Sequence, residues 1–379
     1  MKSVIFSVLA LLTLLCPSMA ESLWTPTVTP MSDPRWASAY SLLPGDRGLI
    51  AGGYSFPADR CVATADLFDP TTRRFMRSRG RLVVPRNFAL ATPLPGGKVL
   101  IAGGYNTVLG TLNSAELFDP ATQTFALLSS RLTSPRELFT ATSLLDGRVL
   151  CVGGFNTHRG RTMGTSDLYD PATQSFTPTG HLEDDRFGQD AVRLADGRVL
   201  VVGGTHWFVR QPTVTLASAE IFDPTTGQFH TTRGPMRFPR DRPTATLLAN
   251  GQVLIAGGQS GTVEPEQAEI FDPATETFTT LSSKMVSPRM AHSAALLPDG
   301  DVLFSGGWSV SHMSTIGDIE VYHPQTQSFR SLSPLPIRAH DQAMLVFSNG
   351  LVLIAGGKEA GGGKESSLST GYTWQFSPQ

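Results

Sequence analysis

Residues 85–104 read PRNFALATPLPGGKVLIAGG and residues 114–136 read SAELFDPATQTFALLSSRLTSPR, after which the same pattern begins again. The most regular feature of this pattern is a pair of adjacent glycines. Such pairs recur at Gly52–Gly53, Gly103–Gly104, Gly153–Gly154, Gly203–Gly204, Gly257–Gly258, Gly306–Gly307 and Gly356–Gly357. Successive pairs are about 50 residues apart, which is the length of one four-stranded repeat unit, so the spacing predicts an array of seven small β-sheets.

Each repeat contains four segments that are typical of β-strands. The first segment ends at a dipeptide such as Asp146-Gly147, which favours positive φ and predicts a two-residue hairpin turn. The second, VLIAGG, is apolar without interruption, so we expect both of its faces to be buried between neighbouring sheets. The third, AELFD, is separated from the fourth by the turn-forming sequence Asp-Pro-Ala-Thr. The fourth begins at an aromatic residue, such as Phe125.

The seventh repeat is incomplete, because it supplies a third strand but no fourth. The repeats begin at Arg35, Arg86, Arg136, Arg186, Arg240, Arg289 and Arg338. Residues 22–31 resemble the end of an internal repeat, and we expect them to pair with residues 370–377 and close the ring. Closure removes open sheet edges. The sequence therefore predicts one all-β domain over residues 21–379, a seven-bladed β-propeller with four-stranded antiparallel blades.

Four recurring features resemble the Kelch-repeat family of β-propellers, as found in secreted bacterial proteins and in the superfamily that includes galactose oxidase. These features are the starting arginine, the glycine pair, the acid two residues before an aromatic, and the aromatic that opens the fourth strand. The resemblance covers residues 22–379. This chain departs from the family pattern in having Phe where Kelch repeats usually carry Trp in the fourth strand, His323 in place of a turn Asp, and no acid in the seventh repeat.

The repeated charged residues are interpreted as structural. Arginine starts all seven repeats, and the acid occurs in six, at Asp66, Glu116, Asp167, Glu220, Glu269 and Glu320. A catalytic site needs one set of groups, whereas these recur in nearly every repeat, so we expect paired ladder charges or bonds to backbone. Cys61 and Cys151 lie in different repeats, and we expect no disulfide between them.

The composition and the first residues bear on partners and location. The 379 residues carry a formal charge of −2 and no basic run, which argues against a nucleic-acid groove. Residues 1–20 read as a signal peptide cleaved after Ala20, with an apolar stretch too short for a typical spanning helix. Cys16 follows the bulky Leu15, which disfavours a lipoprotein. The expected product is a secreted or periplasmic monomer with no membrane span.

Function is expected where the repeats differ. The loops after the glycine pairs vary in length and content, and they share one face with the connections between repeats, where binding usually resides. The candidate ligand-binding residues on that face are Trp36, Tyr54, Phe88, Tyr105, Phe155, His206, Trp207, Arg242, His292, Trp308 and His340. Similar positions line the ligand mouth of peptide-binding Kelch domains. Aromatic rings with a few Arg and His suit a protein partner or a glycan, and we expect non-catalytic binding without a cofactor.

Two enzymatic alternatives stay open at this point. The resemblance to galactose oxidase implies copper held by Tyr and His, with a Tyr–Cys cross-link and a ligand from a further domain. Cys151 lies in a predicted buried strand, so we expect no metal site. The second alternative is a sugar mutarotase or epimerase, for which Asp190, Asp241, Asp341 and Arg242 are candidate acid, base or binding groups.

Overall fold

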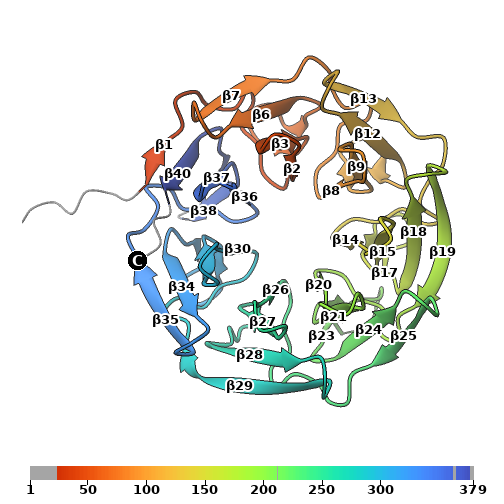
Figure 1. Ribbon diagram of the computed structural model, residues 1–379, viewed down its shortest axis with the longest axis vertical. Coiled ribbons are helices and arrows are strands. Elements are labelled where there is room, and N and C mark those ends of the chain that lie inside the picture. Colours follow the sequence, from red (N-terminus) through yellow and green to blue (C-terminus); the bar gives the residue numbers. More distant parts are fainter. Residues whose placement is uncertain (1–23, 211, 362–363, 376–379) are drawn as a thin grey trace, which may run out of the picture.

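The computed structural model describes residues 24–210, 212–361 and 364–375, and all regular structure in them is β-strand (Figure 1). The predicted signal peptide and Cys16 lie outside the described residues. Within these ranges the chain has no helix long and apolar enough to cross a bilayer. Cys61 and Cys151 are both buried free thiols, as expected.

Seven four-stranded antiparallel sheets stand in a ring, which confirms the predicted seven-bladed propeller. In Figure 1 the first strand of each blade lies nearest the axis and the last lies at the perimeter. The blades, from inside to outside, are β2 (Ala39–Leu43), β3 (Arg47–Ala51), β6 (Ala65–Asp69), β7 (Arg74–Arg77); β8 (Leu90–Pro93), β9 (Val99–Ala102), β12 (Ala115–Asp119), β13 (Thr124–Leu127); β14 (Thr140–Ser143), β15 (Val149–Val152), β18 (Thr165–Asp170), β19 (Ser175–His181); β20 (Asp190–Arg193), β21 (Val199–Val202), β24 (Ala219–Asp223), β25 (Gln228–Thr231); β26 (Thr244–Leu247), β27 (Val253–Ala256), β28 (Gln267–Asp272), β29 (Thr277–Lys284); β30 (Ser293–Leu296), β31 (Val302–Ser305), β34 (Ile319–His323), β35 (Ser328–Leu332); and β36 (Ala343–Val346), β37 (Leu351–Ala355), β40 (Gly371–Gln375), β1 (Thr25–Pro26).

The start of the described chain completes the seventh blade. Thr25 pairs with Thr373 and Pro26 with Tyr372, so β1 is the outermost strand beside β40 (Figure 1). Trp24, just before β1, is 3% exposed, and its ring lies 5.8 Å from that of Trp374. The predicted closure of the ring is therefore confirmed, with the regular pairing confined to two residues on each side.

The core lies between neighbouring blades. Every residue of β9 is buried, as its uninterrupted apolar sequence predicts. Phe118 of the second blade packs in one cluster with Leu49 and Leu67 of the first, and all three are buried. Each such side chain contributes about 1.5–3 kcal/mol when it leaves water. One blade cannot cover both of its own faces, so stacking the sheets in a circle is what buries them.

The repeated arginines and acids form buried ion pairs inside six of the seven blades, which confirms their structural interpretation. The six pairs and their N–O distances are Arg35–Asp66 2.8 Å, Arg86–Glu116 2.9 Å, Arg136–Asp167 2.9 Å, Arg186–Glu220 2.8 Å, Arg240–Glu269 3.0 Å and Arg289–Glu320 2.5 Å. In the second blade, Arg86 also donates to the carbonyls of Gly103 and Ser114. Arg86 therefore ties the segment that precedes the first strand of its blade to the ends of the second and third strands.

The seventh repeat differs from the prediction by one residue. His340 occupies the β-bridge position that directly follows the buried arginine in other blades, so Ala339 stands where that arginine would be. Arg338 is exposed, and Tyr372, the partner of Ile354, takes the place of the acid. The assignment of Arg338 as a seventh repeat-start arginine is therefore wrong. A buried arginine without its acid is costly, so the loss of both groups in one blade is physically consistent.

The turn between the first two strands also differs from the prediction. The backbone N–H of Leu144 donates to Arg148, so three residues close the turn rather than two. Gly147 has φ +86°, and Asp146 accepts the backbone N–H of Arg148 through its side chain. This is the geometry of a three-residue hairpin in which glycine takes the left-handed position.

A close approach between blades explains the glycine pairs. A Cβ on Gly103, whose φ is +60°, would lie 2.7 Å from the carbonyl oxygen of Arg136 in the next blade. A Cβ on Gly104 would lie 2.4 Å from the carbonyl oxygen of Asn87. The amide of Gly104 donates to Arg136, so the same contact also bonds the two blades together.

Candidate functional site

The variable segments after the glycine pairs form short hairpins in six of the blades. These are β4 (Tyr54–Ser55) with β5 (Arg60–Cys61), β10 (Tyr105–Asn106) with β11 (Gly110–Thr111), β16 (Phe155–Asn156) with β17 (Arg161–Thr162), β22 (Thr205–His206) with β23 (Val214–Thr215), β32 (Trp308–Ser309) with β33 (Ser314–Thr315), and β38 (Lys358–Gly361) with β39 (Lys364–Ser367). In the fifth blade a bridge between Ser260 and Val263 takes the same place. We call the surface that carries these segments the hairpin face.

Isolated β-bridges tie the first residue of each hairpin segment to the residue after the repeat-start position. The bridged pairs include Trp36–Tyr54, Asn87–Tyr105, Glu137–Phe155, Phe187–Thr205, Met290–Trp308 and His340–Lys358. Two groups of candidate residues that are distant in sequence therefore meet on one face. Their contact with a ligand stays a prediction.

A rim of seven residues surrounds the axis, one from each blade and each two positions after the repeat-start residue. The rim consists of Ala37, Phe88, Leu138, Gly188, Arg242, Ala291 and Asp341, all with φ between 50° and 65°. Six backbone hydrogen bonds of 2.8 to 3.4 Å run from one rim residue to the rim residue of the preceding blade. Left-handed backbone is rarely adopted by residues other than glycine, so its recurrence here reflects a constraint of the ring.

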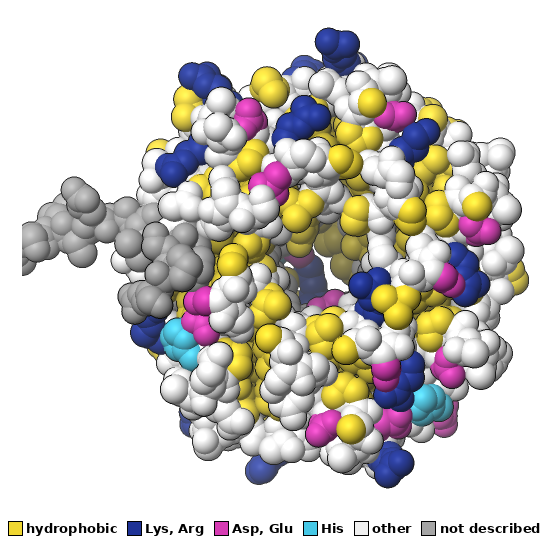
Figure 2. Space-filling view, in the orientation of Figure 1, with side chains coloured by type: hydrophobic (Ala, Val, Ile, Leu, Met, Phe, Trp, Pro, Cys, Tyr) yellow, Lys and Arg dark blue, Asp and Glu magenta, His cyan; other side chains and the backbone are white. Residues whose placement is uncertain are grey.

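A cavity of about 380 Å³ lies on the axis beside this rim, and Figure 2 shows the molecule hollowed at its centre. Its wall is built from the innermost strands. Four of these strands contribute an alanine to the wall, Ala141, Ala191, Ala245 and Ala294, whose side chains are too short to fill the channel. The alternation of small and polar residues in the first strands therefore leaves an opening in an otherwise packed ring.

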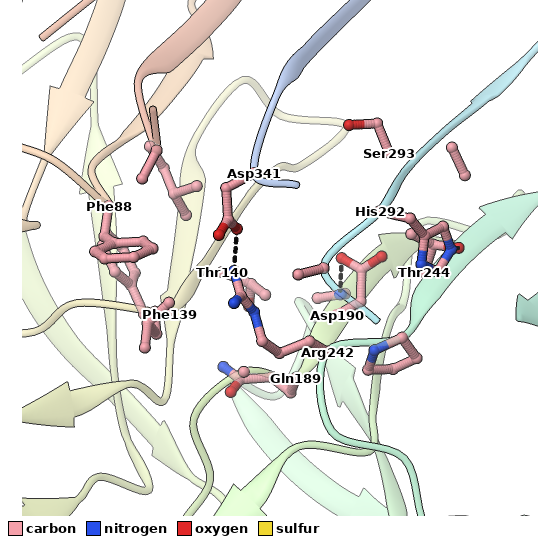
Figure 3. A pocket seen from close by; sticks show the side chains of 18 of the residues that line it. Phe88, Phe139, Thr140, Gln189, Asp190, Arg242, Thr244, His292, Ser293 and Asp341 are labelled. Carbon is pink, nitrogen blue, oxygen red and sulfur yellow. Dashed lines mark hydrogen bonds and ion pairs between the residues drawn. The ribbon is translucent and has the colours of Figure 1, made fainter. Parts of the chain in front are cut away.

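An ion pair crosses part of the rim. The Arg242 guanidinium of the fifth blade contacts the Asp341 carboxylate of the seventh, and the two side chains point toward one another in Figure 3. His340 Nδ1 also lies 2.7 Å from the Asp341 carboxylate. Burial raises the pKa of Asp341, but the opposing effects of Arg242 and His340 are larger together, so its pKa lies below the usual value. Asp341 is therefore charged at neutral pH.

Two further titratable groups stand in the wall. The Asp190 carboxylate accepts the backbone N–H of Ala245 at 2.7 Å and of Ala191 at 2.8 Å, yet burial still raises its pKa to about 6. His292 is buried with Nε2 2.9 Å from the Thr244 hydroxyl, and burial lowers its pKa to about 3, helped by nearby arginines. His292 is therefore a neutral wall residue rather than an open contact on the hairpin face (Figure 3).

Half-buried rings gather around Trp36, and we call them the aromatic arc. Phe56 lies parallel to Trp36 with centroids 6.1 Å apart, while Phe88 meets it edge-on at 5.2 Å. His340 lies 6.0 Å from Trp36, and Trp308 lies 6.1 Å from His340. The arc therefore joins candidate residues from the first, second, sixth and seventh blades. Phe56 was not among the predicted residues, because it lies inside a variable segment and has no equivalent position in the other repeats.

Of the other predicted aromatics, Tyr54 lies 6.3 Å from Trp36 and belongs with the arc, whereas Phe155 and Trp207 form a separate group in the third and fourth blades. Phe155 lies 5.4 Å from Phe187 and 5.3 Å from Trp207, and His206 lies 4.7 Å from Phe208. Tyr105 lies between the two groups, with its backbone bridged to Asn87. The structure thus divides the candidate residues into two sets rather than one continuous ring.

Glu137 is a titratable group on the hairpin face that sequence reasoning missed. It is 8% exposed, and its carboxyl group makes no hydrogen bond or ion pair within the described ranges. Burial raises the pKa of Glu137 from 4.5 to about 7. The sequence did offer one signal for Glu137. It directly follows a repeat-start arginine, which is the position that made Trp36 a candidate.

The raised pKa of Glu137 predicts a specific pH dependence of stability. The folded state holds this proton more tightly than the unfolded state, so the stabilising contribution of this group is fully present below pH 4.5 and is lost as pH rises to about 7. The shift corresponds to about 3 kcal/mol. We expect Glu137→Gln to remove this contribution in urea titrations at pH 5 and pH 8. The exposed Glu183→Gln should keep the wild-type pH dependence, and equal pH dependence in all three proteins would contradict the assignment.

The residues near the mouth do not fit a copper site. Tyr54 donates its hydroxyl to Asp59, and His340 bonds to Asp341. Cys61 is the cross-strand partner of Tyr54, but its sulfur lies 3.4 Å from the backbone oxygen of Tyr105. Among the described residues no three His, Cys, Asp or Glu side chains converge as metal ligands. The tyrosine, histidine and cysteine side chains are therefore dispersed among other partners.

Comparison with known proteins supports the fold alone. No protein-family model matches the chain, and no curated protein matches its sequence. Among solved structures, the chain is similar to a fungal alcohol oxidase of the AA5 family, solved in complex with copper. The TM-score is 0.70 at 16% sequence identity, over 93% of this chain and 76% of the oxidase. At this identity the likeness establishes the propeller architecture and carries no activity across.

Proposed function

We propose that this protein binds a glycan, without catalysis, at the mouth formed by the aromatic arc and the rim. The observation that carries the proposal is that Phe88 of the aromatic arc and the Arg242–Asp341 ion pair line one cavity of about 380 Å³, with Trp36 edge-on to Phe88 at 5.2 Å. The repeated Arg, glycine pair and acid support a Kelch-type propeller, and residues 1–20 support an exported protein.

The chemistry of the mouth matches a sugar ring better than a broad protein surface. Sites for small ligands are concave, measure about 300–1,000 Å³, and combine aromatic surface with a few placed polar groups. The apolar face of a sugar can pack on Trp36 or Phe56, while Arg242 and Asp341 offer a donor and an acceptor to its hydroxyls. A stable interface with a protein partner buries about 800 Å² of surface on each side, which calls for a broad contact area rather than a concave mouth.

Replacement of Trp36 tests the proposal. We expect the mature protein to bind members of a glycan array, and Trp36→Ala to weaken the strongest interaction at least tenfold in calorimetry, about 1.4 kcal/mol. Phe238→Ala is the matched control, because Phe238 is half-buried beside Arg237 and Arg240 and lies outside the arc. Unchanged affinity in Trp36→Ala, or no binding to any glycan, would reject the proposal. A large loss of thermal stability would instead indicate that Trp36 has a structural role and fills the end of the channel.

A sugar mutarotase or epimerase is the second candidate, and one observation favours it. Asp190 stands in the cavity wall with a pKa raised to about 6, which suits an acid or base near neutral pH. Polarimetry on the same free sugars separates the two functions. An enzyme speeds the equilibration of anomers, whereas a binding protein leaves its rate unchanged.

A further inference from the structure

The hairpins of the third and fourth blades differ from the others in net charge, and the hairpin of the second blade beside them is uncharged. Residues 105–113, 155–164 and 205–217 contain Arg159, Arg161 and Arg210, and no Asp or Glu. In the corresponding segments of the first and seventh blades each basic residue is matched by an acid, Arg60 by Asp59, and Lys358 and Lys364 by Glu359 and Glu365. The fifth segment carries only the acids Glu264 and Glu266, and the sixth has no Lys, Arg, Asp or Glu. A net positive charge is therefore found in the segments of the third and fourth blades, although the whole chain is slightly acidic.

These three hairpins also expose apolar side chains. Val108 is 88% exposed, and Leu109, Val209 and Val214 are exposed as well. Trp207 and Phe208 are half-buried beside them. A cluster of exposed apolar residues on a soluble domain commonly marks an interaction surface.

Contacts between the hairpins join them into one surface. Thr111 and Thr157 exchange hydrogen bonds between the second and third blades, with each hydroxyl accepting the other residue's backbone N–H. The backbone N–H of Thr162 donates to Trp207 at 3.1 Å, and a β-bridge joins Arg161 to Phe208. We call this continuous region, described except for residue 211, the basic hairpin surface.

Among the described residues, the three guanidinium groups have no acidic partner. Arg159, Arg161 and Arg210 form no ion pair within the ranges that the structure describes, whereas Lys358 on the seventh blade pairs with Glu365 at 2.8 Å. Arg159 and Arg210 are exposed. Their positive charge is therefore open to a partner of the opposite sign.

We propose that the basic hairpin surface docks on an anionic phospholipid bilayer. Arginines near an anionic leaflet are attracted to its headgroups, and Trp is favoured at the depth of the membrane interface. Val108 and Leu109 protrude from a hairpin rather than line a groove, so a soft interface can cover them without a shaped pocket. An acidic polymer would satisfy the arginines but would leave these apolar side chains in water. The inference is independent of ligand binding at the mouth.

Vesicle sedimentation tests this proposal with the full mature chain. We expect binding to vesicles of phosphatidylcholine with 30% phosphatidylglycerol, used as probe, and at least tenfold weaker binding to phosphatidylcholine alone. Raising the salt to about 1 M, where the Debye length is about 3 Å, should weaken the interaction. Two variants, Val108→Ser with Leu109→Ser and the triple change of Arg159, Arg161 and Arg210 to Gln, should each lose at least tenfold in affinity.

Val263→Ser is the matched control, since Val263 is 61% exposed, close to Leu109 at 56%, but stands beside Glu264 on the fifth blade. It should bind as the wild type does. Failure of the wild type to sediment with anionic vesicles would overturn the proposal. Wild-type binding by the Val108 and Leu109 double variant would also overturn it and would point to an acidic polymer or protein, as would equal affinity for soluble dextran sulfate. Melting temperatures check that every variant is folded.

Discussion

Replacing Arg86 by Ala is expected to destabilise the protein by about 3–5 kcal/mol. Arg86 is 1% exposed, and it holds Glu116 at 2.9 Å while donating to two backbone carbonyls. Its removal leaves a buried carboxylate without its counter-charge and two carbonyl groups without their donor. Urea unfolding should show a large fall in the midpoint, provided that the variant still folds.

Arg338→Ala is the matched control for this change, because Arg338 is exposed and lies one residue before the position of the buried arginines. Its effect should stay within about 0.5 kcal/mol. A paired variant, Arg86→Met with Glu116→Leu, should recover part of the stability, since it removes both buried charges together but leaves the backbone N–H groups of Val83 and Val84 without their acceptor. If Arg86→Ala and Arg338→Ala behaved alike, the assignment of these arginines as structural would be wrong.

Trp24→Ala is expected to cost about 3–5 kcal/mol and to weaken closure of the ring. The Trp24 ring is buried against Trp374, and its indole N–H donates to the Ser333 carbonyl at 3.1 Å. It therefore anchors the short β1 strand, together with the backbone hydrogen bonds from Thr27 to Gly371 and from Met31 to Ser369. Loss of that anchor exposes the edge of β40, so we expect a lower melting temperature together with concentration-dependent aggregation.

Val28→Ala provides the comparison, because Val28 lies in the same closing segment but is exposed. This change should leave both melting temperature and light scattering near wild-type values. A Trp24→Ala protein as stable and as monodisperse as Val28→Ala would show that the segment around β1 does not latch the ring.

The repeat pattern was sufficient to predict the architecture, because each recurring feature has its structural role within its own repeat or against the next repeat. The uninterrupted apolar second strand must be covered on both faces, and the glycine pair marks where the next blade's backbone approaches. The recurrence of Arg and acid six times identified them as structural before any contact was known. The same reasoning failed at Arg338, since the sequence contains an arginine there and only the strand register shows that Ala339 occupies the buried position.

The candidate site depends on contacts between side chains of different blades, and the repeat pattern does not predict these contacts. Arg242 and Asp341 are 99 residues apart, and they meet because a ring of seven blades brings the fifth and seventh close to the same axis. Likewise, Phe56 reaches Trp36 only through the fold of its hairpin, and the raised pKa of Glu137 follows from burial by neighbouring elements. Sequence alone thus determined the seven stacked sheets and the face that varies, because those follow from periodic burial and turn chemistry. Only the tertiary structure decided which unlike side chains converge, because that convergence is set by the closed geometry of the ring.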